Sequence, residues 1–171
     1  MGLPRQVLLV GLGDVPARLL ADVANGLREA LGIASRAATP LGQPAYAFNK
    51  DRCQYHAPAI LRRLSALRSS AASTPVMGLV DVDLFLPETE YVIGEADRSA
   101  GVAVFSSARL QGEADALRHR ACAEAVHCVG CLLGLSSCLD YRCAMFASRD
   151  ALDSDRKGPG LCPSCRVALG L

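Results

Sequence analysis

The stretch Cys138-Leu-Asp-Tyr-Arg-Cys143 is followed near the end of the chain by Cys162-Pro-Ser-Cys165. Each pair holds two thiols close together, and two such pairs supply the four soft ligands that a tetrahedral zinc ion prefers. The segment between the pairs is rich in Asp, Gly and Pro and offers little apolar surface for burial. We therefore predict one structural zinc, bound by Cys138, Cys143, Cys162 and Cys165, that orders this segment in place of a core.

A redox role for the second pair is the alternative. Cys162 and Cys165 have the spacing of a thioredoxin-type dithiol, which should open a helix after a strand. The residues from 134 onward look irregular by pattern, and two more cysteines lie just upstream. The sequence therefore favours metal binding over redox chemistry, with four unliganded thiols as the remaining reading.

The composition is that of a globular chain. Of its 171 residues, 51% are hydrophobic and 20% are charged, which is enough apolar content for one domain with its own core. A net charge of +1 and 5% aromatic residues argue against nucleic-acid binding. No apolar run reaches the roughly 18 residues of a membrane span, and we see no signal-peptide pattern. Eight cysteines suit a reducing, cytoplasmic location in which thiols bind metal.

Strand and helix patterns precede the cysteine-rich end. Asp14 is expected to cap the first helix and Gly32 to end it. We expect strands at 6–12, 76–85, 91–93 and 102–105. We expect one helix that ends near 31 and two more at 55–67 and 113–133. The expected loops or linkers are 37–47, 69–74 and the residues from 134 onward. This order predicts a single α/β (α+β) domain over 1–171, with a twisted mixed sheet. Its α/β part is 1–133, and its zinc-bound part is 134–171.

The last predicted helix carries a second set of candidate ligands. His127 and Cys131 are four residues apart, so both side chains project from the same helical face. Two ligands at this spacing can chelate one metal, as in zinc peptidases. Gly134 is expected to break the helix and allow Ser137 to approach as a third group.

These residues resemble the signature of the archaemetzincins, a metzincin-type zinc metalloprotease family. That signature is His-Glu-x-x-His-x-x-Gly-x-x-His-Cys-x4-Cys-x-Met, then about seventeen residues, then Cys-x2-Cys. Six positions of the frame are matched here, with a final gap one residue short: Gly134, Cys138, Cys143, Met145, Cys162 and Cys165. Upstream segments such as Asp51-Arg-Cys-Gln-Tyr-His and Gly78-Leu-Val-Asp-Val-Asp are also similar. The resemblance extends over roughly 52–166 and implies a metzincin-like fold.

The resemblance also shows where the chain departs from the family. In its register the first His is His127, the general-base Glu position is Cys128, and the second and third His positions are Cys131 and Ser137. A catalytic zinc of this type needs three protein ligands and a carboxylate that takes the proton of its water. The resemblance therefore implies a degenerate peptidase centre without a second, catalytic zinc, and Met145 as the Met-turn.

Three functions remain open at this point. The first is an inactive archaemetzincin homologue that keeps the structural zinc and binds a peptide or protein along the edge of the old cleft. The second is an active metallopeptidase with an unusual metal site at His127 and Cys131. The third is a zinc-stabilised redox or interaction module that uses Cys122, Cys128 and Cys131. Neither nucleic acid nor a membrane is an expected partner.

Overall fold

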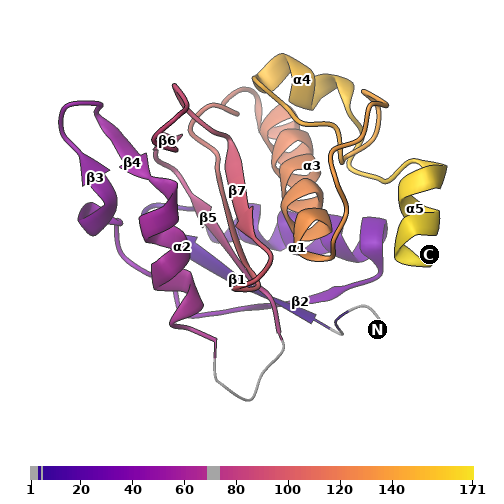
Figure 1. Ribbon diagram of the computed structural model, residues 1–171, viewed down its shortest axis with the longest axis horizontal. Helices are drawn as coiled ribbons and strands as arrows, with labels where there is room; N and C mark the ends of the chain where they lie inside the picture. Colours follow the sequence, from indigo (N-terminus) through magenta and orange to yellow (C-terminus); the bar gives the residue numbers. More distant parts are fainter. Residues whose placement is uncertain (1–3, 5, 69–73) are drawn as a thin grey trace.

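The computed structural model describes residue 4 and residues 6–68 and 74–171, and a five-stranded sheet forms its centre (Figure 1). The strands run in the order β2-β1-β5-β8-β7. Four of them are parallel, whereas β7 pairs antiparallel with β8 at one edge, so the prediction of a mixed sheet is confirmed. Their bounds are β1 (Gln6–Leu12), β2 (Ala34–Ala37), β5 (Val76–Val80), β7 (Gly94–Asp97) and β8 (Val102–Ser106).

Helices cover both faces of this sheet. Helices α1 (Ala17–Leu31) and α3 (Ala114–Leu132) lie side by side on one face, and α2 (Ala57–Ser65) lies on the other (Figure 1). The molecule therefore has three layers, with the sheet between two layers of helix, as is usual for an α/β domain.

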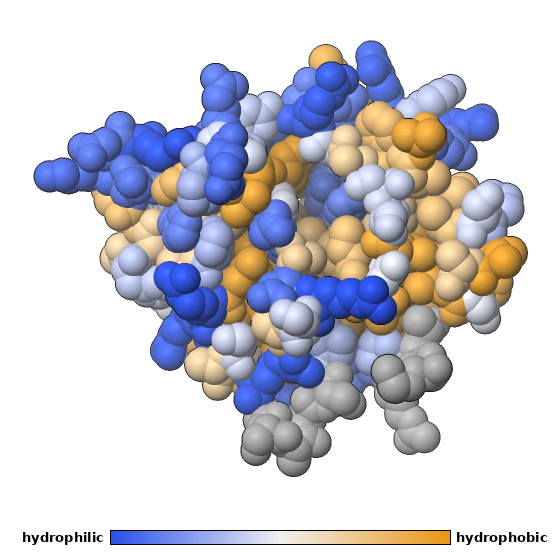
Figure 2. All heavy atoms as spheres, viewed as in Figure 1, coloured by the Kyte–Doolittle hydropathy of each residue, from blue (hydrophilic) through white to orange (hydrophobic). Residues whose placement is uncertain are grey.

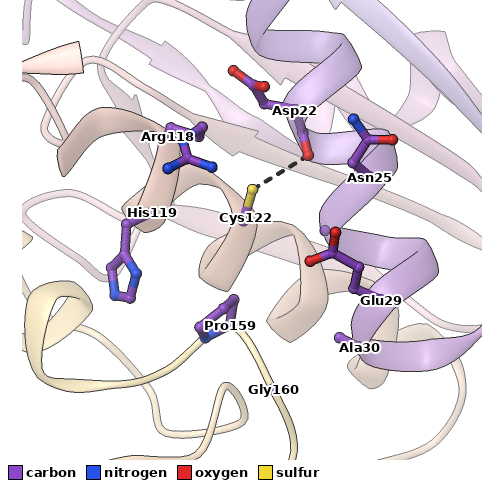
Figure 3. A pocket seen from close by; sticks show the side chains of 10 residues that line it. Asp22, Asn25, Glu29, Ala30, Arg118, His119, Cys122, Pro159 and Gly160 are labelled. Carbon is purple, nitrogen blue, oxygen red and sulfur yellow. Dashed lines mark hydrogen bonds between the residues drawn. The ribbon is translucent and has the colours of Figure 1, made fainter. Parts of the chain in front are cut away.

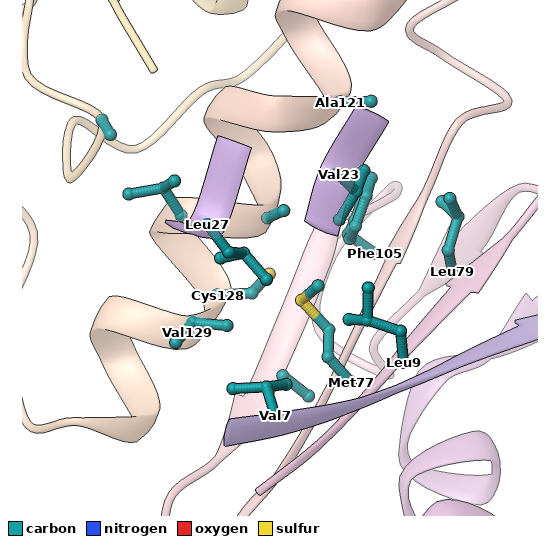
Figure 4. Close-up of a cluster of buried hydrophobic side chains, with 14 of the residues drawn as sticks. Val7, Leu9, Val23, Leu27, Met77, Leu79, Phe105, Ala121, Cys128 and Val129 are labelled. Carbon is teal, nitrogen blue, oxygen red and sulfur yellow. The ribbon is translucent and has the colours of Figure 1, made fainter. Parts of the chain in front are cut away.

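The strands are buried on both sides because alternate residues point to opposite faces. In β1, Val7 and Leu9 contact the α1–α3 layer, whereas Val10 and Leu12 pack toward α2. Leu9 is in register with Met77 of β5, which lies in the same buried cluster (Figure 4). The apolar run that predicted strand 6–12 is thus a central strand with those bounds.

The ends of α1 confirm one prediction and correct another. Gly32 ends the helix in the left-handed conformation, with φ 68°, and its N–H donates to Arg28 O. Asp14 does not cap the helix, because the N-cap residue is Pro16 and no side chain caps the first turn. Pro16 is accommodated there because the first N–H groups of a helix have no partner within it.

Several predicted element bounds are wrong in detail. The expected strand 76–85 is two strands, β5 and β6 (Leu84–Phe85), because the chain bends between them. The second half joins a small sheet with β3 (Phe48–Asn49) and β4 (Gln54–His56), so helix 55–67 begins only at Ala57. The expected loop 37–47 contains a 3-10 turn at Ala45–Ala47. The expected strand 91–93 makes a single bridge at Val92, and the edge strand is β7 instead.

The C-terminal segment is less irregular than predicted. It contains α4 (Ala151–Arg156), which Asp150 caps by accepting a hydrogen bond from the Asp153 N–H, and α5 (Pro163–Leu169). Val167 and Leu171, at the end of the chain, are exposed. In Figure 2 apolar side chains gather on the side of the molecule where α5 lies, whereas hydrophilic ones cover the β3–β4 corner.

Two further predictions concern linkers and membranes. The predicted linker 69–74 lies outside the described residues except for its last position. Over the part of the chain that the structure describes, no helix has the length and apolar character required to cross a bilayer.

Candidate metal centre

The structure brings the four predicted zinc ligands together. Their Sγ atoms all lie within 4.8 Å of one another, and Cys138 Sγ is 3.8 Å from Cys162 Sγ. Four sulfur atoms at the usual Zn–S distance in a tetrahedron are separated by about 3.8 Å. All four are free thiols, so the donor set and its spacing fit a zinc ion without rearrangement of a disulfide.

Local backbone geometry favours thiolates at this cluster. The N–H groups of Asp140, Met145 and Cys162 each lie 3.3–3.4 Å from a sulfur, the first from Cys138 and the other two from Cys143. Hydrogen bonds of this kind stabilise the charged form that binds metal. The backbone N–H of Cys165 likewise lowers the pKa of Cys162 to about 7, whereas burial outweighs the N–H contacts at Cys143 and raises the pKa of Cys143 and of Cys165.

The argument against a redox role for Cys162 and Cys165 rested partly on an irregular C-terminus, and that premise was wrong. Cys162 is the N-cap of α5, so the pair does open a helix. No strand precedes it, however, because the described residues between α4 and Cys162 are irregular. The two sulfurs also share their surroundings with Cys138 and Cys143, which favours metal binding.

A second set of candidate residues lies on α3. His127 Nδ1 is 3.1 Å from the carbonyl oxygen of Ala144, the residue before Met145. Because a carbonyl only accepts hydrogen bonds, Nδ1 carries the proton, and Nε2 is left without one in the neutral ring. Burial and the nearby Lys157 lower the pKa of His127, so the neutral ring is the stable form. This is the orientation in which metal-binding histidines are usually held.

Cys128 fills space rather than facing solvent. It is only 2% exposed, and its Sγ lies 3.9 Å from the carbonyl oxygen of Val104. A Cβ atom at Gly94 would lie 2.9 Å from this sulfur, so the edge strand can approach α3 closely only because position 94 is glycine. Burial raises the pKa of Cys128 well above its usual value. Cys128 is therefore a neutral, packed thiol that cannot accept a proton as a carboxylate does.

Two cavities lie between α3 and the chain around β7. They measure about 350 and 150 Å³ and share Gly94, His127 and Cys128 in their linings, and we call them together the cleft. Half-buried Cys131 and Glu95 line the smaller one, and burial raises the pKa of Glu95.

The cleft residues do not assemble a preformed metal cluster. Among the described residues, His127 and Cys131 form no group of three with another His, Cys, Asp or Glu that could hold an ion. Ser137 is exposed in the segment that follows α3. The predicted residual site therefore contributes at most a two-residue chelate in this structure.

A buried ion pair that the sequence analysis missed supports this region. Lys157 Nζ lies 3.0 Å from Glu124 Oε1, and it also donates to the carbonyl oxygens of Ala144 and Phe146. Two hydroxyl groups donate to the same carboxylate oxygen at 2.7 Å, those of Ser148 and Ser154. Glu124 is the only charged residue between Ala121 and Leu135. A single acidic residue in an otherwise uncharged stretch of helix was the sequence feature that could have indicated a buried ion pair.

The sequence analysis also missed the structural role of Gly130. Met145 is fully buried, and a Cβ atom at Gly130 would overlap its Sδ, so the turn at Met145 packs directly on the helix backbone. A glycine inside a long helix is unfavourable by propensity, which was the signal for a close approach. Cys131 packs against the same small core as Cys143 and Cys165, so the cleft and the four-cysteine cluster share a wall.

Comparisons with known proteins agree with this architecture. A sequence model described as peptidase family M54 matches residues 21–170. Archaemetzincin from Aeropyrum pernix is 31% identical over 170 residues, which cover 96% of this chain and 92% of the relative. The crystal structure of an archaemetzincin from Methanopyrus kandleri superimposes with a TM-score of 0.85 at 29% identity, over 98% of this chain and 97% of that one. A zinc-dependent peptidase from Methanocorpusculum labreanum also gives a TM-score of 0.85, at 26% identity, over 95% of this chain and 99% of that one.

Proposed function

Because the chain belongs to the archaemetzincins, peptidase family M54, we propose that it is a homologue with one structural zinc and an inactive peptidase centre. The observation that carries the inactivity is Cys128, a buried neutral thiol at the position where the family places its general base. The observation that carries the zinc is the spacing of the four sulfur atoms.

The four-cysteine cluster supports a structural role for the metal. Zinc bound there would join the segment after α3 to α5 and leave no open coordination position for substrate. The second pair, Cys162 and Cys165, lies at the start of α5, and most other side chains of this helix are exposed and bury little apolar surface. The thiols would remain available for zinc in a reducing compartment such as the cytoplasm.

The cleft supports the loss of peptide hydrolysis. A zinc peptidase needs a metal-bound water and a carboxylate that takes its proton. In the family's register, Cys128, Cys131 and Ser137 replace the Glu and two of the three His residues. The loss of the general base alone would cost on the order of 10²–10⁴-fold in rate, and a missing metal would remove water activation as well.

An active enzyme with an unusual metal site is the second candidate. His127 Nδ1 is held by Ala144 O, which leaves Nε2 available as a ligand, and Cys131 lines the same cavity. The redox module is less favoured, because burial raises the pKa of both Cys122 and Cys128 and thus suppresses the reactive thiolate.

The partner that fits the cleft is an extended peptide or a protein segment. Among the described strands, β7 pairs only with β8, so its other edge offers backbone groups for pairing next to the cleft. A peptide can add to such an edge as a further strand without being cleaved.

Zinc per chain and peptide cleavage, measured on the same protein purified without added zinc, test the proposal. One zinc per chain and no cleavage above that of a metal-free control support it. Two zincs with cleavage that His127→Ala abolishes would select the active enzyme. No tightly bound zinc would overturn the structural site.

A further inference from the structure

A cavity of about 350 Å³ lies between α1 and α3, in front of the loop that contains Pro159 and Gly160 (Figure 3). None of its lining residues lines the cleft. Its volume is within the usual range of small-molecule sites and holds about a dozen water molecules. It is therefore large enough for an amino acid or a dipeptide.

The close packing of the two helices forms the floor of this cavity. A Cβ atom at Gly26 would lie 2.9 Å from Cys122 Sγ, so glycine is required for the approach of α1 to α3. The Cys122 thiol donates to the carbonyl oxygen of Asp22 at 3.4 Å. Burial raises the pKa of Cys122 to about 11, so the thiol stays neutral and provides an unreactive surface.

Opposite charges face one another across the cavity. The carboxylate of Glu29 projects from α1, whereas the guanidinium of Arg118 and the ring of His119 project from α3 (Figure 3). Although Glu29 and Arg118 line one cavity, they form no ion pair with each other. Among the described residues, Glu29 has no ion-pair or hydrogen-bond partner for its side chain.

The side of the cavity that carries Arg118 and His119 is also available for a ligand. The ion-pair partner of Arg118 is Asp115 at 3.5 Å, and with Asp115 95% exposed this contact is weak. His119 Nε2 lies 2.9 Å from the Lys157 carbonyl oxygen and so carries a proton, which leaves Nδ1 of the neutral ring as an acceptor. A ligand can therefore recruit these groups without breaking a strong contact.

We propose that this cavity binds a small zwitterion, an amino acid or dipeptide, with its carboxylate at Arg118 and its ammonium group at Glu29. The planar fork of an arginine matches a carboxylate, and a glutamate accepts the hydrogen bonds of an ammonium group. Such a ligand gives Glu29 a partner and Arg118 a second one at the same time, which a simple anion or cation cannot do.

Titration of the zinc-bound, isotope-labelled protein with dialanine, followed by amide NMR, tests the proposal. The amide signals of 22–30 and 118–122 should shift together, with a Kd of about 1 mM or lower. N-acetyl-dialanine and dialanine amide, which each lack one charge, should bind at least about tenfold more weakly. Glu29→Gln and Arg118→Gln should each weaken dialanine binding by a similar factor, and both side chains are exposed enough for the variants to fold.

Matched controls remove a charge elsewhere on the surface. Glu88→Gln and Arg62→Gln change exposed residues outside the cavity and should bind dialanine as the parent does. The proposal fails if dialanine shifts no signal of the lining residues, or if the blocked derivatives bind equally well. It also fails if the shifts appear at 94–96 and 131, because dialanine then occupies the cleft.

Discussion

Lys157 and Glu124 form an ion pair of 3.0 Å with side chains that are 0% and 5% exposed. All three hydrogens of the ammonium group have an acceptor, in Glu124, Ala144 and Phe146. The pair therefore joins the middle of α3 to the Met145 turn and to the chain after α4. A buried charge of this kind is tolerated only while its partners remain.

Lys157→Met should destabilise the protein by about 3–5 kcal/mol, because it leaves the Glu124 carboxylate buried without a counter-charge. The double variant Glu124→Gln/Lys157→Met should recover much of that loss. Urea unfolding monitored by circular dichroism measures both free energies. As a control, Arg118→Met breaks an exposed pair and should change the free energy of unfolding by less than about 1 kcal/mol. An equally stable Lys157→Met protein would contradict the structural role.

Removal of zinc should loosen the segment after α3 while the sheet persists. Structural zinc contributes on the order of 10 kcal/mol of apparent binding energy, and the segment has little core of its own. Cys143→Ala, or a strong chelator, should increase amide hydrogen exchange over 134–171 far more than over 76–80 and 102–106. Cys53→Ala, which changes an exposed thiol, is the matched control. Unchanged protection of the segment in metal-free protein would argue against the zinc site.

Gly130→Ala should destabilise the protein by about 1–3 kcal/mol, although alanine is the better helix former. The reason is the overlap between the new methyl group and Met145 Sδ. Met145→Val removes the sulfur, so the double variant should be less destabilised than the sum of the single changes. Thermal unfolding of the four proteins gives this coupling. If the destabilising effects of the two single changes simply add, Met145 does not contact α3 at Gly130.

The pH dependence of stability should include Asp83. Burial alone would raise its pKa, but hydrogen bonds from Arg109 and Gln54 outweigh it and hold the pKa below its usual value. The unfolded state then binds the proton more tightly, so this contribution is present above about pH 4 and is lost as the pH falls further. Asp83→Asn should flatten that part of the stability profile. The partly exposed pair limits the effect to about 1 kcal/mol.

Cys128→Glu, Cys131→His and Ser137→His together should restore the family's motif around His127. We expect a second zinc per chain in the triple variant and one in the parent, as measured by elemental analysis. Peptidase activity need not return with the metal. A well-folded triple variant with a single zinc would mean that the register of the motif is wrong. The same substitutions without Cys131→His provide the control for nonspecific uptake.

The sequence predicted the parts of this fold that depend on local pattern. The strand at 6–12 and the helix ending at Gly32 are recognisable because their apolar residues recur at a fixed period. The four cysteines come together as predicted because short pairs limit where their sulfurs can lie. The split of 76–85 was missed because its second half pairs with β4, and pairing between distant segments leaves no periodic trace.

The sequence indicated which residues of α3 face the cleft, but not the contacts that hold the cleft in place. His127 and Cys131 share one helical face, and the structure places both on the cleft. The contact of Lys157 with Glu124 depends on how the segment after α4 returns to α3, which no local rule specifies. The packing of the Met145 side chain against the α3 backbone at Gly130 likewise depends on how the segment after α3 folds back onto that helix.

The register of Leu9 with Met77 has a consequence for how the chain is made. Strand β1 leaves the ribosome before β5 and can pair with β2, but its other neighbour, β5, begins only at Val76. Non-local pairing of this kind slows folding, and apolar strands that await a partner are prone to aggregate. Interrupted synthesis before Val76 would therefore expose the apolar strand Gln6–Leu12, and nascent-chain capture by a chaperone is expected to be strongest at that length.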